Sequence, residues 1–329
     1  MKIGKASELV LNRSVFKQIR HRRDEVIVRP RVGVDCSAIH VGEDEAIVIS
    51  TNPVTCSIDE LGKFAITLAT NNVVCSGAEP IGVMTSILLP RKSGEQTIKR
   101  LVRDMEEQCE KWNLEIVGGH TEYSSAVNQP IITVTGIGKV KKGEMLVAKA
   151  IKPGHEIVMT KWAGLEGTSI LACEKEEELK ERYATSFIED AKNLSCYASI
   201  LPEASIAKRV GVIAMHDVSE GGIYEALWEM TNAANVGFYV DLTQIPLKQE
   251  TIEVCEFFDL NPYMLMSSGS LLIVTEEGNR LVDELSQEGI KATVIGRITQ
   301  GHGRMIANED ERKYVQPPRF DELYKVTEL

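Results

Sequence analysis

Two segments of the chain share one pattern, in which a short apolar run is followed by paired glycines and polar side chains. The first segment is Gly118-Gly119-His120-Thr121-Glu122, which follows the apolar residues 114–117. The second is His216-Asp217-Val218-Ser219-Glu220-Gly221-Gly222, which follows residues 210–215. Glycine lets backbone amides approach a ligand closely, and free amides at a turn or helix start attract anions. We therefore expect each segment to turn after a buried strand, and the pair to hold a phosphorylated ligand between two domains.

Strand and helix patterns alternate in the first half of the chain. Strands are predicted at residues 45–50, 81–89, 115–117 and 131–137, and helices at residues 60–76 and 94–112. This alternation is typical of an α/β or α+β layer.

A lysine- and glycine-rich passage at residues 138–153 is the candidate domain junction. It predicts an N-terminal domain over residues 1–150 and a C-terminal domain over residues 151–329, in keeping with about 150 residues per domain. A second core begins at residues 155–160, and beyond it strands are predicted at residues 210–215, 267–275 and 292–298. Helices are predicted at residues 222–235 and 279–288, with two or three more within 174–209.

Composition narrows the class of protein. The net charge of −11 argues against general nucleic-acid binding, which needs a basic surface. No apolar run reaches the roughly 18 to 20 residues of a membrane helix, and the charged start does not indicate a secretory signal. Seven scattered cysteines without a CxxC pair favour buried thiols in a reducing compartment. We expect a cytoplasmic protein.

A local basic cluster departs from the acidic balance, since seven arginine and lysine residues lie between positions 13 and 31. These side chains form either a solvated helix face with a charged strand, or a group in which one or two arginines neutralise ligand phosphates.

The polar residues of the second segment have two interpretations each. Asp217 either caps the following turn or holds a magnesium ion that bridges phosphates, and Ser219 has the same alternatives. Gly221 and Gly222 weaken a helix start unless another group must come close, which favours a ligand.

The first segment follows the same logic, with Gly118, Gly119 and Thr121 as candidate ligand-binding residues. His120 is a candidate general acid or base or a phosphate donor, and its alternative is a satisfied polar group near a strand end. Glu122 is the better metal ligand, because magnesium prefers carboxylate oxygens to imidazole.

Further polar groups end apolar strands or interrupt a helix. Asp35 lies in Gly33-Val34-Asp35-Cys36-Ser37, Asn52 follows the strand at residues 45–50, and Asn71-Asn72 interrupts the helix at residues 60–76. Amides are unfavourable inside a helix, so Asn71 and Asn72 belong either to an exposed polar face or to a binding site. The chain has no P-loop, GxSxG or HExxH motif.

Taken in order, these segments resemble the aminoimidazole ribonucleotide synthetase superfamily, and most closely its hydrogenase-maturation carbamoyl dehydratase branch. Five short motifs carry the resemblance: Gly33-Val34-Asp35, Asn71-Asn72-Val73-Val74-Cys75-Ser76-Gly77-Ala78-Glu79-Pro80, Val117-Gly118-Gly119-His120-Thr121-Glu122, His216-Asp217-Val218-Ser219-Glu220-Gly221-Gly222 and Ser267-Ser268-Gly269. Each motif is weak by itself, but their order along nearly the whole chain is specific.

The resemblance implies two α/β domains, with the N-terminal sheet pairing across a homodimer. It also implies ATP and magnesium, with phosphoryl transfer to a small or amide-like acceptor, where catalysis is mainly positioning and charge neutralisation. Asp35, Asn52, Asn72 and His120 fall where relatives commonly carry acidic residues. Asp35, Glu122 and Asp217 are then the candidate metal ligands, His120 and Glu122 the candidate catalytic residues.

Two departures shape the functional expectation. Only Asp35 is a carboxylate among the four N-terminal positions, so magnesium should be held less firmly. The dehydratase carries its substrate on a C-terminal cysteine, whereas the last cysteine here is Cys255. We expect an ATP-dependent enzyme with an unidentified acceptor. The alternatives are a catalytically weakened homologue that acts as a nucleotide-binding regulator or scaffold, and a thiamine-phosphate-type kinase.

Overall fold

The computed structural model describes residues 26–28, 34, 36–42, 44–56, 58, 60–316 and 320–327. Contacts divide it into two compact units, one formed by the described residues up to Met145 apart from Val34, and the other by those from Leu146 onward together with Val34. We call them the N-terminal and C-terminal units. Asp35 and the basic cluster between positions 13 and 31 lie outside the described residues.

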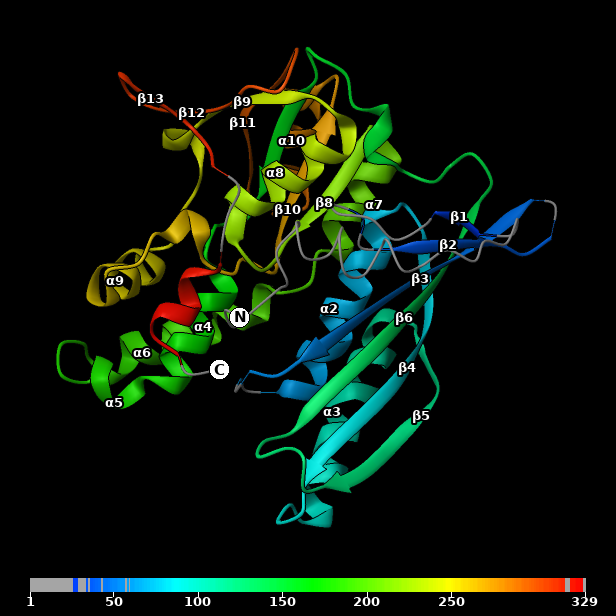
Figure 1. The fold of residues 1–329 in the computed structure, drawn as a ribbon, viewed down its shortest axis with the longest axis vertical. Helices are drawn as coiled ribbons and strands as arrows, with labels where there is room; N and C mark the ends of the chain where they lie inside the picture. Colours follow the sequence, from blue (N-terminus) through cyan, green and yellow to red (C-terminus); the bar gives the residue numbers. More distant parts are fainter. Residues whose placement is uncertain are drawn as a thin grey trace. The chain divides into compact units, whose positions relative to one another are not determined.

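The N-terminal unit is built on a six-stranded sheet in the order β1-β2-β3-β6-β4-β5 (Figure 1). The strands are β1 (Val26–Val28), β2 (Ser37–His40), β3 (Glu45–Val54), β4 (Glu79–Pro90), β5 (Glu115–Ser124) and β6 (Ile131–Lys141), and the helices are α2 (Leu61–Cys75) and α3 (Glu95–Trp112). Only β4 and β5 are parallel among these neighbouring pairs. The edge strand β5 is therefore reached through α3, as a parallel connection requires.

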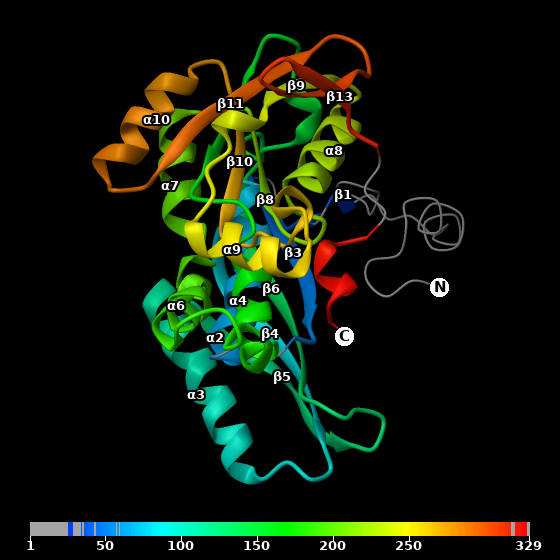
Figure 2. The same cartoon turned by 90° about the vertical axis from the view of Figure 1, so that its left-hand side faces the viewer.

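Helices α2 and α3 cover one face of this sheet (Figure 2). On β6 the buried residues alternate with half-buried ones, because successive side chains of a strand point to opposite faces. The buried set packs under α2, where an alanine at Gly136 would lie 3.1 Å from the Val73 side chain. We call this side the helix face and the other side the open face.

The C-terminal unit contains a seven-stranded sheet in the order β13-β12-β9-β11-β7-β10-β8. Its strands are β7 (Glu156–Thr160), β8 (Ala214–Val218), β9 (Gly237–Asp241), β10 (Ser270–Thr275), β11 (Ala292–Thr299), β12 (Arg304–Asn308) and β13 (Glu311–Tyr314). Its α-helices are α4 (Leu165–Glu174), α5 (Glu176–Leu179), α6 (Thr185–Lys192), α7 (Leu201–Val210), α8 (Gly222–Ala234), α9 (Gln249–Phe258) and α10 (Gly278–Gln287). Its short 3₁₀ segments are η3 (Ala148–Ala150), η4 (Asn193–Tyr197), η5 (Leu242–Gln244), η6 (Pro262–Met264) and η7 (Glu322–Lys325).

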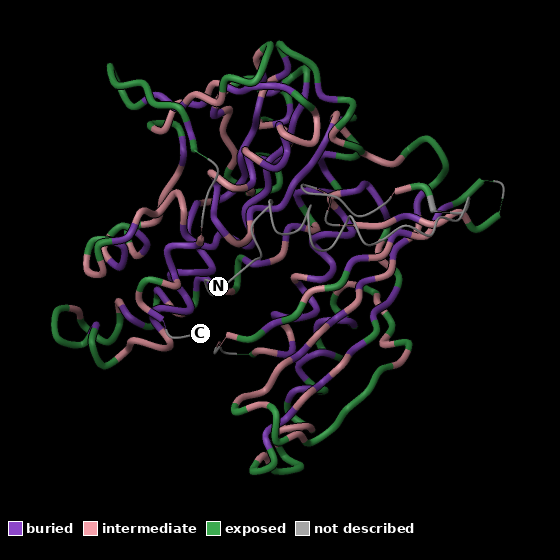
Figure 3. The backbone as a smooth tube through the Cα atoms, viewed as in Figure 1, coloured by how far each residue is buried: buried purple, intermediate pink, exposed green. Residues whose placement is uncertain are grey.

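The core of the C-terminal unit lies between this sheet and its helices. Ile157, Met159, Phe238 and Leu272 are fully buried there, and α8 contributes Leu227. Figure 3 shows much of the backbone of this unit in purple, the colour of buried residues.

The mixed α/β class predicted from the alternating patterns is confirmed, while several boundaries move. The strand predicted at 115–117 continues to Ser124, and the strand predicted at 210–215 begins only at Ala214 because Val210 still belongs to α7. The helices predicted within 174–209 are α5, α6 and α7, and α4 precedes them.

Within the described part of the chain, none of the helices combines the length and the apolar composition needed to cross a bilayer.

Candidate functional site

The second glycine segment forms a corner between β8 and α8. His216 and Asp217 are buried inside β8 rather than beyond its end, with Asp217 opposite Leu271 of β10. Gly221 and Gly222 have φ of 81° and 63°, in the left-handed region that favours glycine. A Cβ atom at Gly222 would lie 2.7 Å from the Tyr263 carbonyl oxygen and 2.8 Å from that of Leu265. The predicted turn is therefore present, and the close packing of the neighbouring backbone explains why residue 222 is a glycine.

The backbone amides of both glycines bond to groups of the chain itself. Gly221 N donates to Asp321 Oδ2 at 2.6 Å, and Gly222 N donates to Ser219 O at 3.1 Å. The other carboxyl oxygen of Asp321 accepts from Leu323 N at 2.9 Å. The Asp321 carboxyl group therefore occupies the position that the sequence pattern predicted for a ligand phosphate. Direct phosphate binding by the Gly221 and Gly222 amides does not fit this geometry.

Four acidic side chains influence one another around this turn, and we call Glu166, Asp217, Glu220 and Asp321 the acidic corner. The pKa of Glu166 is raised to about 7, mainly by burial; the hydrogen bonding with Ser268 opposes this rise, and the charges of Glu220 and Asp217 add to it. Burial likewise raises the pKa of Asp321 to about 8, with Glu166 and Glu220 adding to the effect. Clustered buried carboxyl groups disfavour a second negative charge, and a cation relieves that cost.

The acidic corner fits magnesium that arrives together with phosphates. Among the residues described, no three His, Cys, Asp or Glu side chains converge closely enough to hold a metal ion by themselves. Magnesium is commonly held by one or two carboxylates, with the remaining positions filled by water and substrate phosphates. Asp217, which is 5% exposed, and Ser219 remain the predicted ligands on this turn.

Sequence reasoning missed Glu166 and Asp321. Glu166 lies in the first turn of α4, after β7 and Gly164 with φ of 74°, so it repeats the strand, glycine and helix pattern used for Asp217. That signal was available. Asp321 lies in the polar C-terminal stretch, and no local pattern points to it, because its role depends on a contact 100 residues away in sequence.

The first glycine segment is not a turn, and the prediction of a corner there is wrong. Gly118 to Glu122 continue β5 as an extended strand parallel to β4, with Gly119 opposite Thr85 and His120 opposite Ser86. The register shifts beside Val83, where a bulge forms. A Cβ atom at Gly119 would overlap the Thr85 carbonyl oxygen, so close strand approach explains this glycine.

His120 and Glu122 lie side by side on the open face of β5. Their Nε2 and Oε2 atoms are 3.1 Å apart, and the side chains are 67% and 48% exposed. Thr121 is exposed on the other face of the same edge strand, and Figure 3 shows most of β5 as exposed. The sheet alone therefore gives His120 and Glu122 no enclosed environment.

Asn52 and Asn72 lie on the helix face, opposite to His120. Asn52 of β3 pairs with Val134, and Asn72 Nδ2 donates to Ser50 Oγ at 3.0 Å. Asn71 and Asn72 are both buried, so the exposed-face interpretation is wrong for them. Asn72 O also accepts from Cys36 Sγ at 2.9 Å, which ties this group to the residue after Asp35.

The N-terminal candidates thus separate into two groups. Strands β3 and β5 are three spacings apart, about 14 Å, and the register places Asn52 and His120 on opposite faces. A single site on one copy of this sheet therefore does not contain both Asn52 and His120.

Comparison with known proteins identifies the family. The sequence model described as AIR synthase related protein, N-terminal domain, matches residues 33–140, and the corresponding C-terminal domain matches residues 152–308. These matches span most of the chain, so the protein belongs to the AIR synthase related family. The predicted resemblance is confirmed.

Relatives on the hydrogenase-maturation branch cover most of the chain. A hydrogenase expression/formation protein of Methanocaldococcus jannaschii is 24% identical over 301 residues, or 89% of this chain and 88% of the relative. Carbamoyl dehydratase HypE of Rhodobacter capsulatus is 26% identical over 253 residues, or 75% and 72%. A crystal structure of hydrogenase maturation protein HypE in complex with ATP has a TM-score of 0.72 at 16% identity, covering 98% of this chain and 97% of that one. This last likeness shows a shared fold.

Proposed function

We propose that this protein binds ATP with magnesium and transfers a phosphoryl group to a small, amide-like acceptor, as an enzyme related to hydrogenase maturation. The observation that carries the proposal is the acidic corner, where Asp217 lies buried at the end of β8 beside the start of α8. The ATP complex of a HypE with the same fold, and the HypE relatives, support it.

The residues of the acidic corner have different roles, which follow from their chemistry. The carboxylate of Asp217 would hold magnesium, which neutralises phosphate charge when it is bound. Asp321 keeps the Gly221 amide saturated, so phosphate would be recognised through the cation rather than through this N–H. Glu166 has a pKa raised to about 7, so its carboxyl group can exchange a proton near neutral pH.

Calorimetric titration with ATP tests the proposal. We expect binding with magnesium and much weaker binding when EDTA replaces it, because the carboxylates repel free triphosphate. An absence of heat in both conditions, with the folded protein verified by circular dichroism, would overturn the proposal.

One observation favours a second candidate, a catalytically weakened homologue that binds nucleotide as a regulator or scaffold. Asn72 supplies a neutral amide that is bonded to Ser50 inside the N-terminal unit. A neutral amide attracts magnesium less than a carboxylate does. If this candidate holds, the double variant Asn52→Asp/Asn72→Asp should hydrolyse ATP faster than the wild type, and rapid wild-type turnover would refute it.

We also propose that the protein is a homodimer joined through the open face. Ile47 and Ile49 of β3, Leu88 of β4 and Ile137 of β6 lie half-buried there, and Met84 is 47% exposed. An apolar sheet face of this kind is usually covered by another layer. Light scattering should give twice the chain mass, and Ile49→Glu should give the monomer. A monomeric wild type would contradict the proposal.

A further inference from the structure

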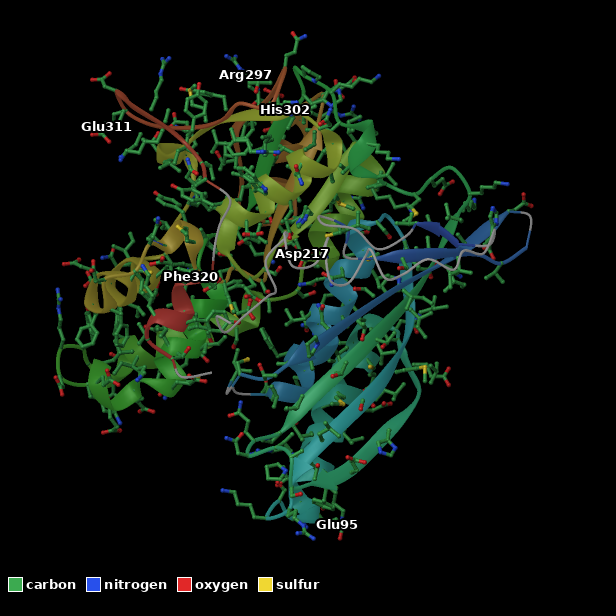
Figure 4. All side chains as sticks on the ribbon, in the orientation of Figure 1. Glu95, Asp217, Arg297, His302, Glu311 and Phe320 are labelled. Carbon is green, nitrogen blue, oxygen red and sulfur yellow. The ribbon has the colours of Figure 1, made fainter. Side chains whose placement is uncertain are left out.

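Residues 320–327 lie beyond residue 308, where the family match ends, and they contain the 3₁₀ segment η7. We call these residues the strap, and Figure 4 labels Phe320 at its start. Asp321 and Leu323 are fully buried, and Glu322 and Thr327 are almost fully buried. The strap is therefore packed into the C-terminal unit, to which it belongs.

Asp321 attaches the strap to the turn that precedes α8. Its Oδ2 atom accepts from Gly221 N at 2.6 Å, and its Oδ1 atom accepts from Leu323 N at 2.9 Å. Gly221 is the N-cap residue of α8, a helix of 13 residues, and a glycine has no side chain with which to cap the helix. Free amides and the helix dipole at such a start attract oxyanions. The strap thus supplies the oxyanion that the start of α8 binds in this structure.

The rest of the strap is held by contacts that do not involve the Asp321 carboxyl group. Glu322 Oε2 accepts from Asn261 N at 2.9 Å, next to η6, and from Lys325 Nζ at 2.7 Å. Thr327 Oγ1 donates to Leu323 O at 3.1 Å, and the Leu323 side chain is fully buried. A change at Leu323 can therefore loosen the strap while the Asp321 carboxyl group stays in the chain.

The Asp321 carboxylate is placed unfavourably for a charged group. Burial raises the pKa of Asp321 to about 8, and the charges of Glu166 and Glu220 add to this rise. A buried carboxylate among like charges is less stable than the same group in water. A phosphate that arrives with magnesium brings a cation, which relieves this cost. Exchange of the carboxylate for such a phosphate is therefore favourable for the charge balance of the acidic corner.

We propose that the strap is an autoinhibitory element, in which Asp321 occupies the position of a nucleotide phosphate on Gly221 N and must leave before that phosphate binds there. This inference rests on the proposed function. While the strap is docked, phosphate reaches the acidic corner through the cation alone. When the strap is released, the Gly221 N–H becomes an additional donor. Docking of the strap lowers the apparent ATP affinity by reducing the fraction of molecules that are ready to bind.

Calorimetric titration of the full chain with ATP and magnesium tests the proposal in two variants. Asp321→Ala removes the competing carboxyl group, whereas Leu323→Ala loosens the strap and keeps that group. Both should bind ATP about five-fold more tightly than the wild type. Asp310→Ala is the matched control, because it removes an exposed carboxylate of the same unit in the turn between β12 and β13. Its Kd should equal that of the wild type.

Hydrogen exchange of the wild type gives a second readout, which does not need a variant. Leu323 N bonds to Asp321 Oδ1, and Thr327 N donates to Leu323 O at 3.1 Å, so exchange at these amides reports on the docked strap. Saturating ATP with magnesium should speed exchange in residues 321–327. A strap with a purely structural role would exchange at the same rate with and without ATP.

Three results would overturn the proposal. In the first, neither Asp321→Ala nor Leu323→Ala binds ATP more tightly than the wild type. In the second, Asp321→Ala alone binds more tightly, because loss of one negative charge then explains the gain. In the third, a wild type that binds ATP shows unchanged or slower exchange of the strap.

Failure of the proposed function gives a different pattern. If neither the wild type nor the two strap variants bind ATP, both proposals are overturned. If the wild type does not bind ATP but both strap variants do, the strap proposal is supported and the wild-type chain is held in its inhibited state. Thermal unfolding shows whether each variant is folded, and the exchange measurement decides the proposal in a wild type that binds ATP even if a variant is not.

Discussion

Two segments with the same sequence pattern fold in different ways in the two units. Gly118 to Glu122 extend an edge strand, and their polar side chains are exposed. His216 to Gly222 pass from the buried strand β8 into the start of α8, and Asp217 is buried. One glycine in each segment, Gly119 in the first and Gly222 in the second, therefore marks close backbone approach, but only the second segment forms a turn.

The partner strand accounts for the difference. In β5 a parallel neighbour, β4, offers hydrogen bonds along the whole segment, so the chain stays extended. In β8 the antiparallel pairing with β10 stops at Val218, and the chain must leave the sheet. The chemistry of the two segments differs as a result, because burial beside β8 raises the pKa values of the neighbouring carboxyl groups of Glu166 and Asp321.

The largest expected effect tests the backbone of the C-terminal corner. Gly222→Ala places a Cβ atom against two carbonyl oxygens at a left-handed φ, so we expect the free energy of unfolding to fall by about 3 kcal/mol. Gly303→Ala is the matched control, since its nearest neighbour would be 3.8 Å away, and it should cost less than about 0.5 kcal/mol. Urea denaturation measures both. Equal losses of unfolding free energy in the two variants would show that close packing at Gly222 is not the cause.

The next prediction concerns the pH dependence of stability. The folded-state pKa of Glu166 is raised to about 7 from 4.5, and that of Asp321 to about 8 from 3.8. The unfolded chain therefore releases these protons at lower pH, and their stabilising contribution is lost as pH rises from about 4 to 8. For Glu166 the shift corresponds to roughly 3 kcal/mol.

Glu166→Gln should flatten this decline, because an amide does not titrate and can still accept from Ser268 N. Denaturation is measured at pH 5 and pH 8 for the wild type, Glu166→Gln and Asp321→Asn. The difference between the two pH values gives the slope of the free energy of unfolding of the C-terminal unit against pH. A wild-type slope retained in both variants would show that these carboxyl groups are not the cause.

The smallest expected effect concerns the exposed pair of the N-terminal unit. His120→Asn removes a surface contact with Glu122 and should change the free energy of unfolding by less than about 0.5 kcal/mol. If His120 acts in catalysis as predicted, the variant should still lose ATP turnover. Stability and turnover measured on the same preparation separate the two roles, and an unchanged turnover would remove His120 from the proposed chemistry.

The sequence predicted the class of fold and the family because those depend on periodic apolar patterns and on motif order. It predicted the β8–α8 turn because Gly221 and Gly222 mark a local conformation. It missed the sheet continuation through Gly118, since that depends on pairing with β4, which is distant in sequence. It also missed Asp321, whose contact with Gly221 joins residues 100 positions apart. Long-range contacts of this kind leave no local signature.

The central claim is that the buried corner, rather than the exposed strand, carries magnesium-dependent nucleotide binding. Calorimetric titration with ATP and magnesium, comparing Asp217→Asn with Glu122→Gln, tests it most directly. The account predicts at least about a ten-fold weaker Kd for Asp217→Asn, a loss of about 1.4 kcal/mol, and a nearly unchanged Kd for Glu122→Gln. Wild-type affinity in Asp217→Asn, with the loss found instead in Glu122→Gln, would contradict it.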